Sequence, residues 1–151
     1  MSNLYIDGDA FPNQLKPILL RAIERSKLST YIISNKQISV GESEHITYIV
    51  VGDGDNEADD KIVEMTEEGD LVVTADIPLA DRIITKKAHA IDHRGELFSA
   101  DKIKHYLAMR NLMQEIRESG MATKGPPSFS QKDAHGFANQ LNKILTKQKL
   151  N

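Results

Sequence analysis

A short apolar run that leads into a carboxylate constrains the fold of this chain more than any other stretch. Leu71–Val73 follows an acidic turn and is succeeded by Thr74 and Asp76. Such a run is typical of a strand buried in a sheet that is covered on both faces. Pro78 then lies where the first turn of a helix accepts a proline. We therefore expect Asp76 at the carboxyl end of a strand, the edge where open α/β sheets bind ligands.

The same pattern occurs near the N-terminus. Residues 4–6 are apolar or aromatic and run directly into Asp7, Gly8 and Asp9. If this strand and the one before Asp76 lie side by side in a parallel sheet, their carboxylates share one edge. The two patterns together predict an acidic pocket.

Strand-like and helix-like segments alternate along the first 92 residues. β-Branched and apolar runs predict strands, and apolar residues at helical spacing predict helices. The alternation is typical of βαβ units, so the sequence predicts an α/β fold with a mainly parallel sheet. The expected strands are residues 4–6, 30–33, 46–51, 71–74 and 88–91, and the expected helices begin near residue 12 and cover 57–68 and 78–87.

Two further helices are expected after residue 93. Residues 101–118 carry apolar side chains at helical spacing, and Gly120 is a suitable helix end. Ser130 and Asp133 have the spacing of a capping box that opens a last helix. The side chains expected on the buried side of helix 101–118 are Ile103, Tyr106, Leu107, Met113 and Ile116.

Length and composition suit one domain. The chain has 151 residues, enough to bury a core, and no cysteine, which excludes disulfides and thiolate metal sites. We expect a single domain over residues 1–151, with a βα core at 1–92 and a helical part at 93–151. The N-terminal segment lacks the pattern of a signal peptide, and no apolar run is long enough to cross a membrane. We therefore expect a soluble, cytoplasmic protein without a membrane partner.

The charge is divided unevenly along the chain. Residues 1–81 hold 16 acidic and 6 basic side chains, a balance of −10, whereas residues 82–151 hold 6 acidic and 13 basic ones, a balance of +7; together they give the net −3. Solvated helix faces of opposite sign would explain this division. The functional alternative is an acidic cation pocket beside a basic surface for a polyanion; the charge pattern alone favours the solvated faces, because blocks of charge are common on ordinary surfaces.

Six aspartates fall at expected strand ends or in the helix starts beside them: Asp7, Asp9, Asp59, Asp60, Asp76 and Asp81. Carboxylates gathered at one edge repel one another unless a cation or proton intervenes, and hard oxygen ligands select Mg²⁺ or Mn²⁺. A metal there could polarise a phosphodiester and activate a water. Alternatively, Asp9 is only a turn residue, and Asp59 or Asp60 only serves a helix N-terminus. This alternative is weaker for Asp7 and Asp76, because a buried strand has no turn for a carboxylate to serve.

Several motifs, in order along nearly the whole chain, resemble the bacterial YaiI/YqxD family. They are YIDGDAFP at residues 5–12, ADD at 58–60, GDLVVTADIPLA at 69–80, RGEL at 94–97, MRNLM at 109–113, RESG at 117–120 and the loop at 123–130. The family itself is uncharacterised but is placed with the PIN-like nucleases. The resemblance implies a three-layer α/β/α sandwich with a central, mainly parallel sheet, the C-terminal helices packed on it, and a metal-dependent acidic site.

The resemblance also implies roles for individual residues. Asp7, Asp59 and Asp76 match the family's catalytic, metal-binding acids, and Asp9 matches a further acid of its Asp-x-Asp motif. Asp81 lies where many PIN domains carry a fourth acid, so it joins the expected metal ligands. The chain departs from the family at several places; for example, His93 stands where the family usually has proline.

Basic residues in the matched motifs suggest that the C-terminal half binds substrate. Arg94, Arg110, Arg117 and Lys124, with Thr74 of the Thr-x-Asp motif, form the expected substrate-binding set, in which the cations contact phosphates. The alternative is that Arg94 and Arg110 pair with Glu96 or with aspartates at the sheet edge to hold the C-terminal helices. The chain has 8 Phe and Tyr residues and no Trp, so any recognition of nucleic acid would rest mostly on backbone and shape.

Three functions remain in competition. The first is a Mg²⁺- or Mn²⁺-dependent nuclease acting on RNA. The second is a non-catalytic nucleic-acid-binding or regulatory module with the same fold. The third, which fits less well, is a phosphatase with Asp7 as nucleophile and Asp9 as acid, because no clear partner lysine follows. A homo-oligomer is compatible with each of them.

Overall fold

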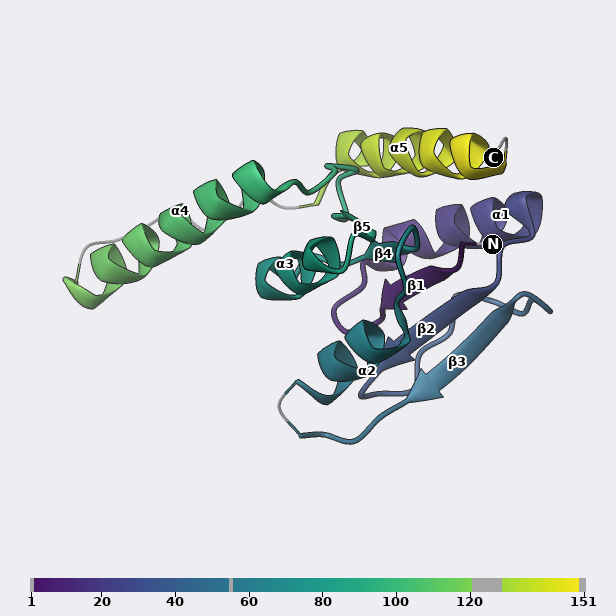
Figure 1. Cartoon of the computed structure of the whole chain (residues 1–151), viewed down its shortest axis with the longest axis horizontal. Helices are drawn as coiled ribbons and strands as arrows, with labels where there is room; N and C mark the ends of the chain where they lie inside the picture. The colour runs from purple at the N-terminus through teal and green to yellow at the C-terminus, as the bar shows by residue number, and fades with distance from the viewer. Residues whose placement is uncertain (1, 55, 121–128, 150–151) are drawn as a thin grey trace.

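The computed structural model describes residues 2–54, 56–120 and 129–149. Within these ranges the strands are β1 (Leu4–Asp7), β2 (Thr30–Ser34), β3 (Ile46–Val50), β4 (Leu71–Val73) and β5 (His89–Ile91). The α-helices are α1 (Lys16–Ser26), preceded by a 3₁₀ turn at Asn13–Leu15, then α2 (Glu57–Met65), α3 (Ile77–Thr85), α4 (Ala100–Glu118) and α5 (Gln131–Lys149) (Figure 1).

The five strands form one parallel sheet in the order β3-β2-β1-β4-β5. The α/β class and the parallel sheet predicted from the sequence are thereby confirmed. Strand order reverses at β1, since the chain first builds outward through β2 and β3 and then returns to add β4 on the other side of β1. Ligands of open α/β sheets bind at such a reversal, outside the carboxyl ends of the strands.

Helices cover both faces of the sheet, which makes three layers. Successive residues of a strand face opposite sides, and the core divides accordingly. Leu4 and Ile6 of β1 pack in one cluster with α1 and α5, whereas Tyr5 packs in a second cluster with α2, α3 and Ile103 of α4. Figure 1 shows α1 and α5 side by side on one face, with α2 and α3 on the other. The expected sandwich is therefore present.

Helix α2 ends earlier than the sequence suggested, at Met65 instead of residue 68. The cause is the buried side chain of Asp70, whose two oxygens accept the backbone N–H groups of Asn3 and Glu67, each at 2.8 Å. These bonds hold the turn before β4 in place, and Thr66 is already extended. Helical spacing alone gives no sign that the Asp70 carboxylate closes this turn.

The expectation of a buried side along α4 was wrong for most of its length. Ile103 is buried, but Tyr106, Leu107, Met113 and Ile116 are only partly so, and Met109 and Leu112 are 43% and 47% exposed. The 19-residue helix is roughly 28 Å long at 1.5 Å per residue, whereas strands of 3–5 residues span only about 10–17 Å. Its C-terminal half therefore extends outward from the sheet (Figure 1).

Two glycines bring α5 against the turn that follows β5. A Cβ atom on Gly95, which has φ +87°, would lie 2.2 Å from the carbonyl oxygen of Gly136 on α5. A Cβ on Gly136 would in turn lie 2.6 Å from the carbonyl oxygen of Arg94. Nothing larger than hydrogen fits at either position. Beside this contact, Nε of Arg94 lies 3.3 Å from an Oδ atom of Asp133.

The predicted capping box at the start of α5 is confirmed. The backbone N–H of Asp133 donates to the Ser130 hydroxyl at 3.2 Å, and the N–H of Ser130 donates to the Asp133 carboxylate at 3.0 Å. Across residues 2–54, 56–120 and 129–149, no helix is both long and apolar enough to span a bilayer.

Candidate metal and phosphate site

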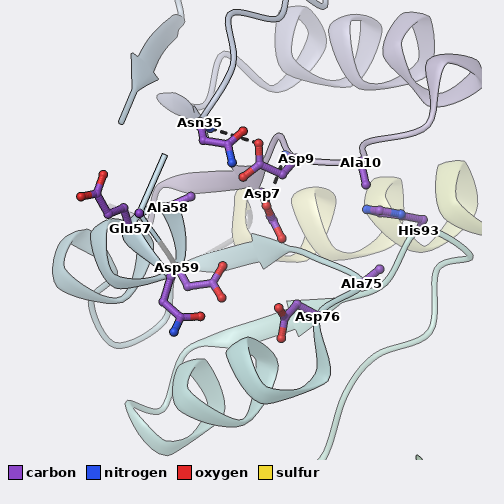
Figure 2. A pocket seen from close by; sticks show the side chains of 12 residues that line it. Asp7, Asp9, Ala10, Asn35, Glu57, Ala58, Asp59, Ala75, Asp76 and His93 are labelled. Carbon is purple, nitrogen blue, oxygen red and sulfur yellow. Dashed lines mark hydrogen bonds between the residues drawn. The ribbon is translucent and has the colours of Figure 1, made fainter. Parts of the chain in front are cut away.

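A pocket of about 430 Å³ lies at the carboxyl end of the sheet, where the strand order reverses. It is lined by Asp7, Asp9, Ala10, Asn35, Gly54, Asn56, Glu57, Ala58, Asp59, Ala75, Asp76 and His93. Four of the predicted acids thus meet here, from the end of β1, the start of α2 and the segment after β4. Figure 2 shows the carboxylates of Asp7, Asp59 and Asp76 directed toward a common space, with Asp9 above them.

Asp7 is the most buried of these acids, at 8% exposure. One of its oxygens accepts the Thr74 hydroxyl at 2.8 Å, and the other accepts the N–H of Asp9 at 3.3 Å. Burial raises the pKa of Asp7 to about 6, helped by the nearby charges of Asp59 and Asp9 and opposed by the bond from Thr74. The fold therefore places a carboxyl group where its charged form is disfavoured.

Thr74 connects the two central strand ends. Besides donating to Asp7, its Oγ1 accepts the backbone N–H of Asp76 at 3.0 Å. The side chain is fully buried, so it lies behind the pocket and orients its carboxylates. The sequence prediction had placed Thr74 among substrate contacts.

Asp76 and Asp9 also have structural bonds. One Asp76 oxygen accepts the N–H of Leu79 at 3.0 Å and so caps α3. One Asp9 oxygen accepts the N–H of Asn35 at 3.0 Å, which ties the end of β1 to the end of β2. Sequence patterns predicted a local turn role for Asp9 and no such role for Asp76, so both bonds differ from that expectation; both carboxylates still line the pocket.

Asp59 and Asp60, adjacent in the first turn of α2, face different surroundings. Asp59 lines the pocket, and its pKa is raised by burial and then by the charge of Asp76. Asp60 is exposed and pairs with Arg82 of α3 at 2.9 Å. Helical geometry turns neighbours by about 100° (3.6 residues per turn), and this turn selects one of the two for the pocket.

The donor set suits a hard divalent cation in part. Oxygen ligands are what Mg²⁺ and Mn²⁺ take, and several unneutralised carboxylates line one pocket. In the part of the chain that the structure describes, however, no three acidic or imidazole side chains converge as a closed metal cage. Mg²⁺ usually keeps several waters and takes only one or two carboxylates, so an open arrangement fits that ion better than a fully coordinating one.

The remaining predicted site residues are distributed unevenly. Asp81 is exposed on α3 and is not among the residues that line the pocket. Arg110 of α4 lines a hollow of about 440 Å³ together with Asn56, Asp59 and Asp76, so it lies beside the acids. Arg94 stands at a neighbouring pocket and forms an ion pair with Asp133 of α5.

Two other predicted phosphate contacts lie further away or outside the description. Arg117 is exposed in the last turn of α4. Lys124 falls outside the described residues.

Four polar residues of the pocket were not singled out from the sequence: Asn35, Asn56, Glu57 and His93. A signal existed for Asn35, because it directly follows β2 and so reaches the same edge as Asp7. Asn56 and Glu57 directly precede or begin α2, as Asp59 does. His93 follows β5 by two residues, but its spacing to the other histidines gave no indication of a role.

Comparison with known proteins identifies a family for this chain but indicates no activity. A family described as "Uncharacterized BCR, YaiI/YqxD family" matches residues 5–147. The chain is similar to a UPF0178 protein of Sulfurimonas denitrificans, 67% identical over 95% of both chains, and to one of Sulfurovum sp., 64% identical over 95% of this chain and 97% of the relative. A UPF0178 protein of Solidesulfovibrio magneticus is 46% identical over 94% of this chain and 95% of its own. No solved structure matches the chain significantly.

Proposed function

This chain belongs to the YaiI/YqxD family, and we propose that it is a metal-dependent nuclease that hydrolyses phosphodiester bonds in RNA. One observation carries the proposal: Asp7, Asp59 and Asp76, from three separate parts of the chain, line one pocket at the strand-order reversal. The resemblance to PIN-like nucleases, which place acids in this way, supports it.

One or two of Asp7, Asp59 and Asp76 would ligate Mg²⁺ or Mn²⁺ directly, and the remaining acids, with Asp9, would accept hydrogen bonds from metal-bound waters. When bound, such an ion polarises the phosphoryl group and lowers the pKa of an attacking water. The side chains position these oxygens: Thr74 fixes Asp7, and the α3 N-terminus fixes Asp76. An ion bound there would neutralise part of the acidic charge and so strengthen the binding of a phosphate group at the pocket.

The position of Arg110 favours a substrate that contains phosphate groups. It is exposed on α4 and lines the hollow that also contains Asp59 and Asp76. A guanidinium group beside a metal site can hold a neighbouring phosphate of the same strand with two hydrogen bonds. RNA is the proposed substrate because the basic half of the chain suits a long polyanion.

The adjacent aspartates of α2 offer a matched test of the nuclease proposal. Asp59→Asn should abolish Mn²⁺-dependent cleavage of labelled single-stranded RNA, because it removes one pocket carboxylate. Asp60→Asn should cleave like the wild type, because Asp60 faces Arg82 outside the pocket. Asp76→Asn should also be inactive and yet melt close to the wild-type midpoint, since asparagine caps helices as well as aspartate does.

The same assay has a clear negative result. Wild-type cleavage by the Asp59→Asn or Asp76→Asn protein would show that the pocket acids are not the site. Cleavage that persists in EDTA would exclude the metal.

A second function has one observation in its favour. Because no closed metal cage is present among residues 2–54, 56–120 and 129–149, the pocket could serve a module that binds RNA without cutting it. That module would bind RNA with a steep salt dependence and show no turnover with either metal. The phosphatase alternative gains no support, since no lysine is among the described residues that line the pocket; turnover of a phosphomonoester would revive it.

A further inference from the structure

A second pocket, of about 440 Å³, adjoins the acidic one. Ala75 and His93 line both pockets, so the two are neighbours separated by these residues. The second pocket is otherwise different in character, being lined by Pro12, Ile77, Phe98, Tyr106 and Phe129 with Asp92, Arg94 and Glu96 as polar members. A mostly apolar wall with a few polar groups is typical of a site for a small organic ring.

The aromatic wall of this pocket is held in place by defined contacts. The Tyr106 hydroxyl donates to the Glu96 carboxylate, and the Tyr106 ring meets Phe98 edge-on at 6.2 Å and 80°. The hydrogen bond raises the pKa of Tyr106 to about 12, so the hydroxyl stays protonated. A ring fixed in this way loses little conformational freedom when another ring stacks on it.

His93 provides a second, independent sign of a ligand. The side chain is only 9% exposed, and its Nε2 has no hydrogen-bond partner among the described residues. Burial and the charge of Arg94 lower the pKa of His93 to about 4, so the imidazole is neutral and can either donate or accept. A buried polar atom without a partner is destabilising, and a ligand with a hydrogen-bonding edge beside this wall would offer one.

We propose that this second pocket binds one nucleobase of a single-stranded RNA, next to the phosphodiester held at the acidic pocket. The inference rests on the proposed function, since it places consecutive parts of one strand in two adjoining pockets. A base fits the chemistry of this pocket: its faces stack on the ring of Tyr106, and its edge carries donors and acceptors for the polar lining residues, among which His93 has an Nε2 without a partner among the described residues. Arg94, at the polar side of the pocket, adds positive charge for the adjoining phosphate.

Binding without metal tests the nucleobase pocket apart from any cleavage. In EDTA, a short fluorescent oligoribonucleotide is titrated with wild type, Tyr106→Ala and Tyr106→Phe, and then with versions lacking one base at each position in turn. Tyr106→Ala should weaken binding of the intact strand about tenfold, the loss typical of one stacked base. Tyr106→Phe keeps the ring and should bind like the wild type. Tyr48→Ala, on the opposite edge strand β3, is the aromatic control and should also bind like the wild type.

The decisive comparison combines protein and RNA changes. For one abasic position, wild type and Tyr106→Ala should bind equally, because the ring then has no partner. Equal weakening of every oligonucleotide by Tyr106→Ala would overturn the proposal, as would an equal loss in Tyr106→Phe or no binding of RNA at all. If this cycle succeeds and no substrate is cut, the nuclease assignment fails and the nucleobase pocket stands. If RNA is cut but binding is insensitive to every missing base, the nuclease assignment stands and the nucleobase pocket fails.

Discussion

Asp7 shows how a single residue can be costly to the fold and central to the proposed site. Its folded pKa of about 6 lies above the ordinary 3.8, so between about pH 4 and 6 the folded chain binds a proton more tightly than the unfolded chain does. The contribution of this group to the free energy of unfolding is therefore greatest below that window. It decreases as the pH rises toward 6 and stays reduced above it.

Asp7→Asn should stabilise the protein at pH 7 while abolishing cleavage. The amide removes the ionised group; its oxygen can accept the N–H of Asp9, and its NH₂ group can donate to the Thr74 hydroxyl. We expect a gain of about 3 kcal/mol at pH 7 and little gain at pH 4, because the pKa is raised from 3.8 to about 6 and each pKa unit corresponds to about 1.36 kcal/mol. Urea unfolding in EDTA at both pH values measures this gain in the free energy of unfolding, with Asp60→Asn as the exposed control. A variant less stable than the wild type at pH 7 would contradict the account.

At the scale of elements, the sequence predicted what short-range rules determine. An apolar run before a carboxylate located β1 and β4, and the Ser-x-x-Asp spacing located the start of α5. The same rules brought Asp7, Asp9, Asp59 and Asp76 to one edge, because carboxyl ends of parallel strands meet there. Other features were beyond such rules: Asp70 closes the turn after α2 and also accepts the N–H of the distant Asn3, and α4 is longer than the sheet it packs on.

His93 escaped prediction for a related reason. Its place in the pocket wall depends on where β5 joins the sheet, beside β4, and no local pattern encodes that neighbour. Asp81 shows the opposite case. Its spacing one helical turn from Asp76 was suggestive, but the side chain is exposed and does not line the pocket.

The two serine caps should differ in their effect on stability. Ser130→Ala removes the hydroxyl that accepts the N–H of Asp133, at the start of a helix whose face packs in the core. We expect a loss of about 1 kcal/mol, which is a drop of roughly 2–4 °C in the melting midpoint. Ser99→Ala, at the cap of the outward-extending α4, should cost less because that helix buries less. Thermal unfolding of both variants measures the two losses of stability. A larger loss for Ser99→Ala would mean that α4 contributes more to the fold than its burial indicates.

At the scale of the whole molecule, the acidic first half forms the pocket while the basic second half supplies cations beside it. Arg110 places one such cation at the hollow shared with Asp59 and Asp76. The net charge of −3 alone would give no reason to expect a polyanion as partner. What favours it is the position of this cation beside the acidic pocket.

Arg110→Gln should reduce the salt dependence of RNA binding. Each phosphate contact on a single strand contributes about 0.7 to the slope of log K against log salt, so the slope should fall by about that amount. Arg21→Gln, an exposed change on α1 at the other face of the sheet, should leave the slope unchanged. Fluorescence anisotropy over a series of salt concentrations measures both slopes. An unchanged slope in Arg110→Gln would remove this residue from the RNA-binding surface.

The buried carboxylate at the end of β1 also bears on how this sequence can evolve. A single base change converts an aspartate codon to an asparagine codon, and by the physical argument above the product would fold better at neutral pH. Selection for folding alone would therefore drive position 7 away from the acid. A chain that carries Asp7 in spite of that pressure is what selection on the chemistry of the pocket would leave behind.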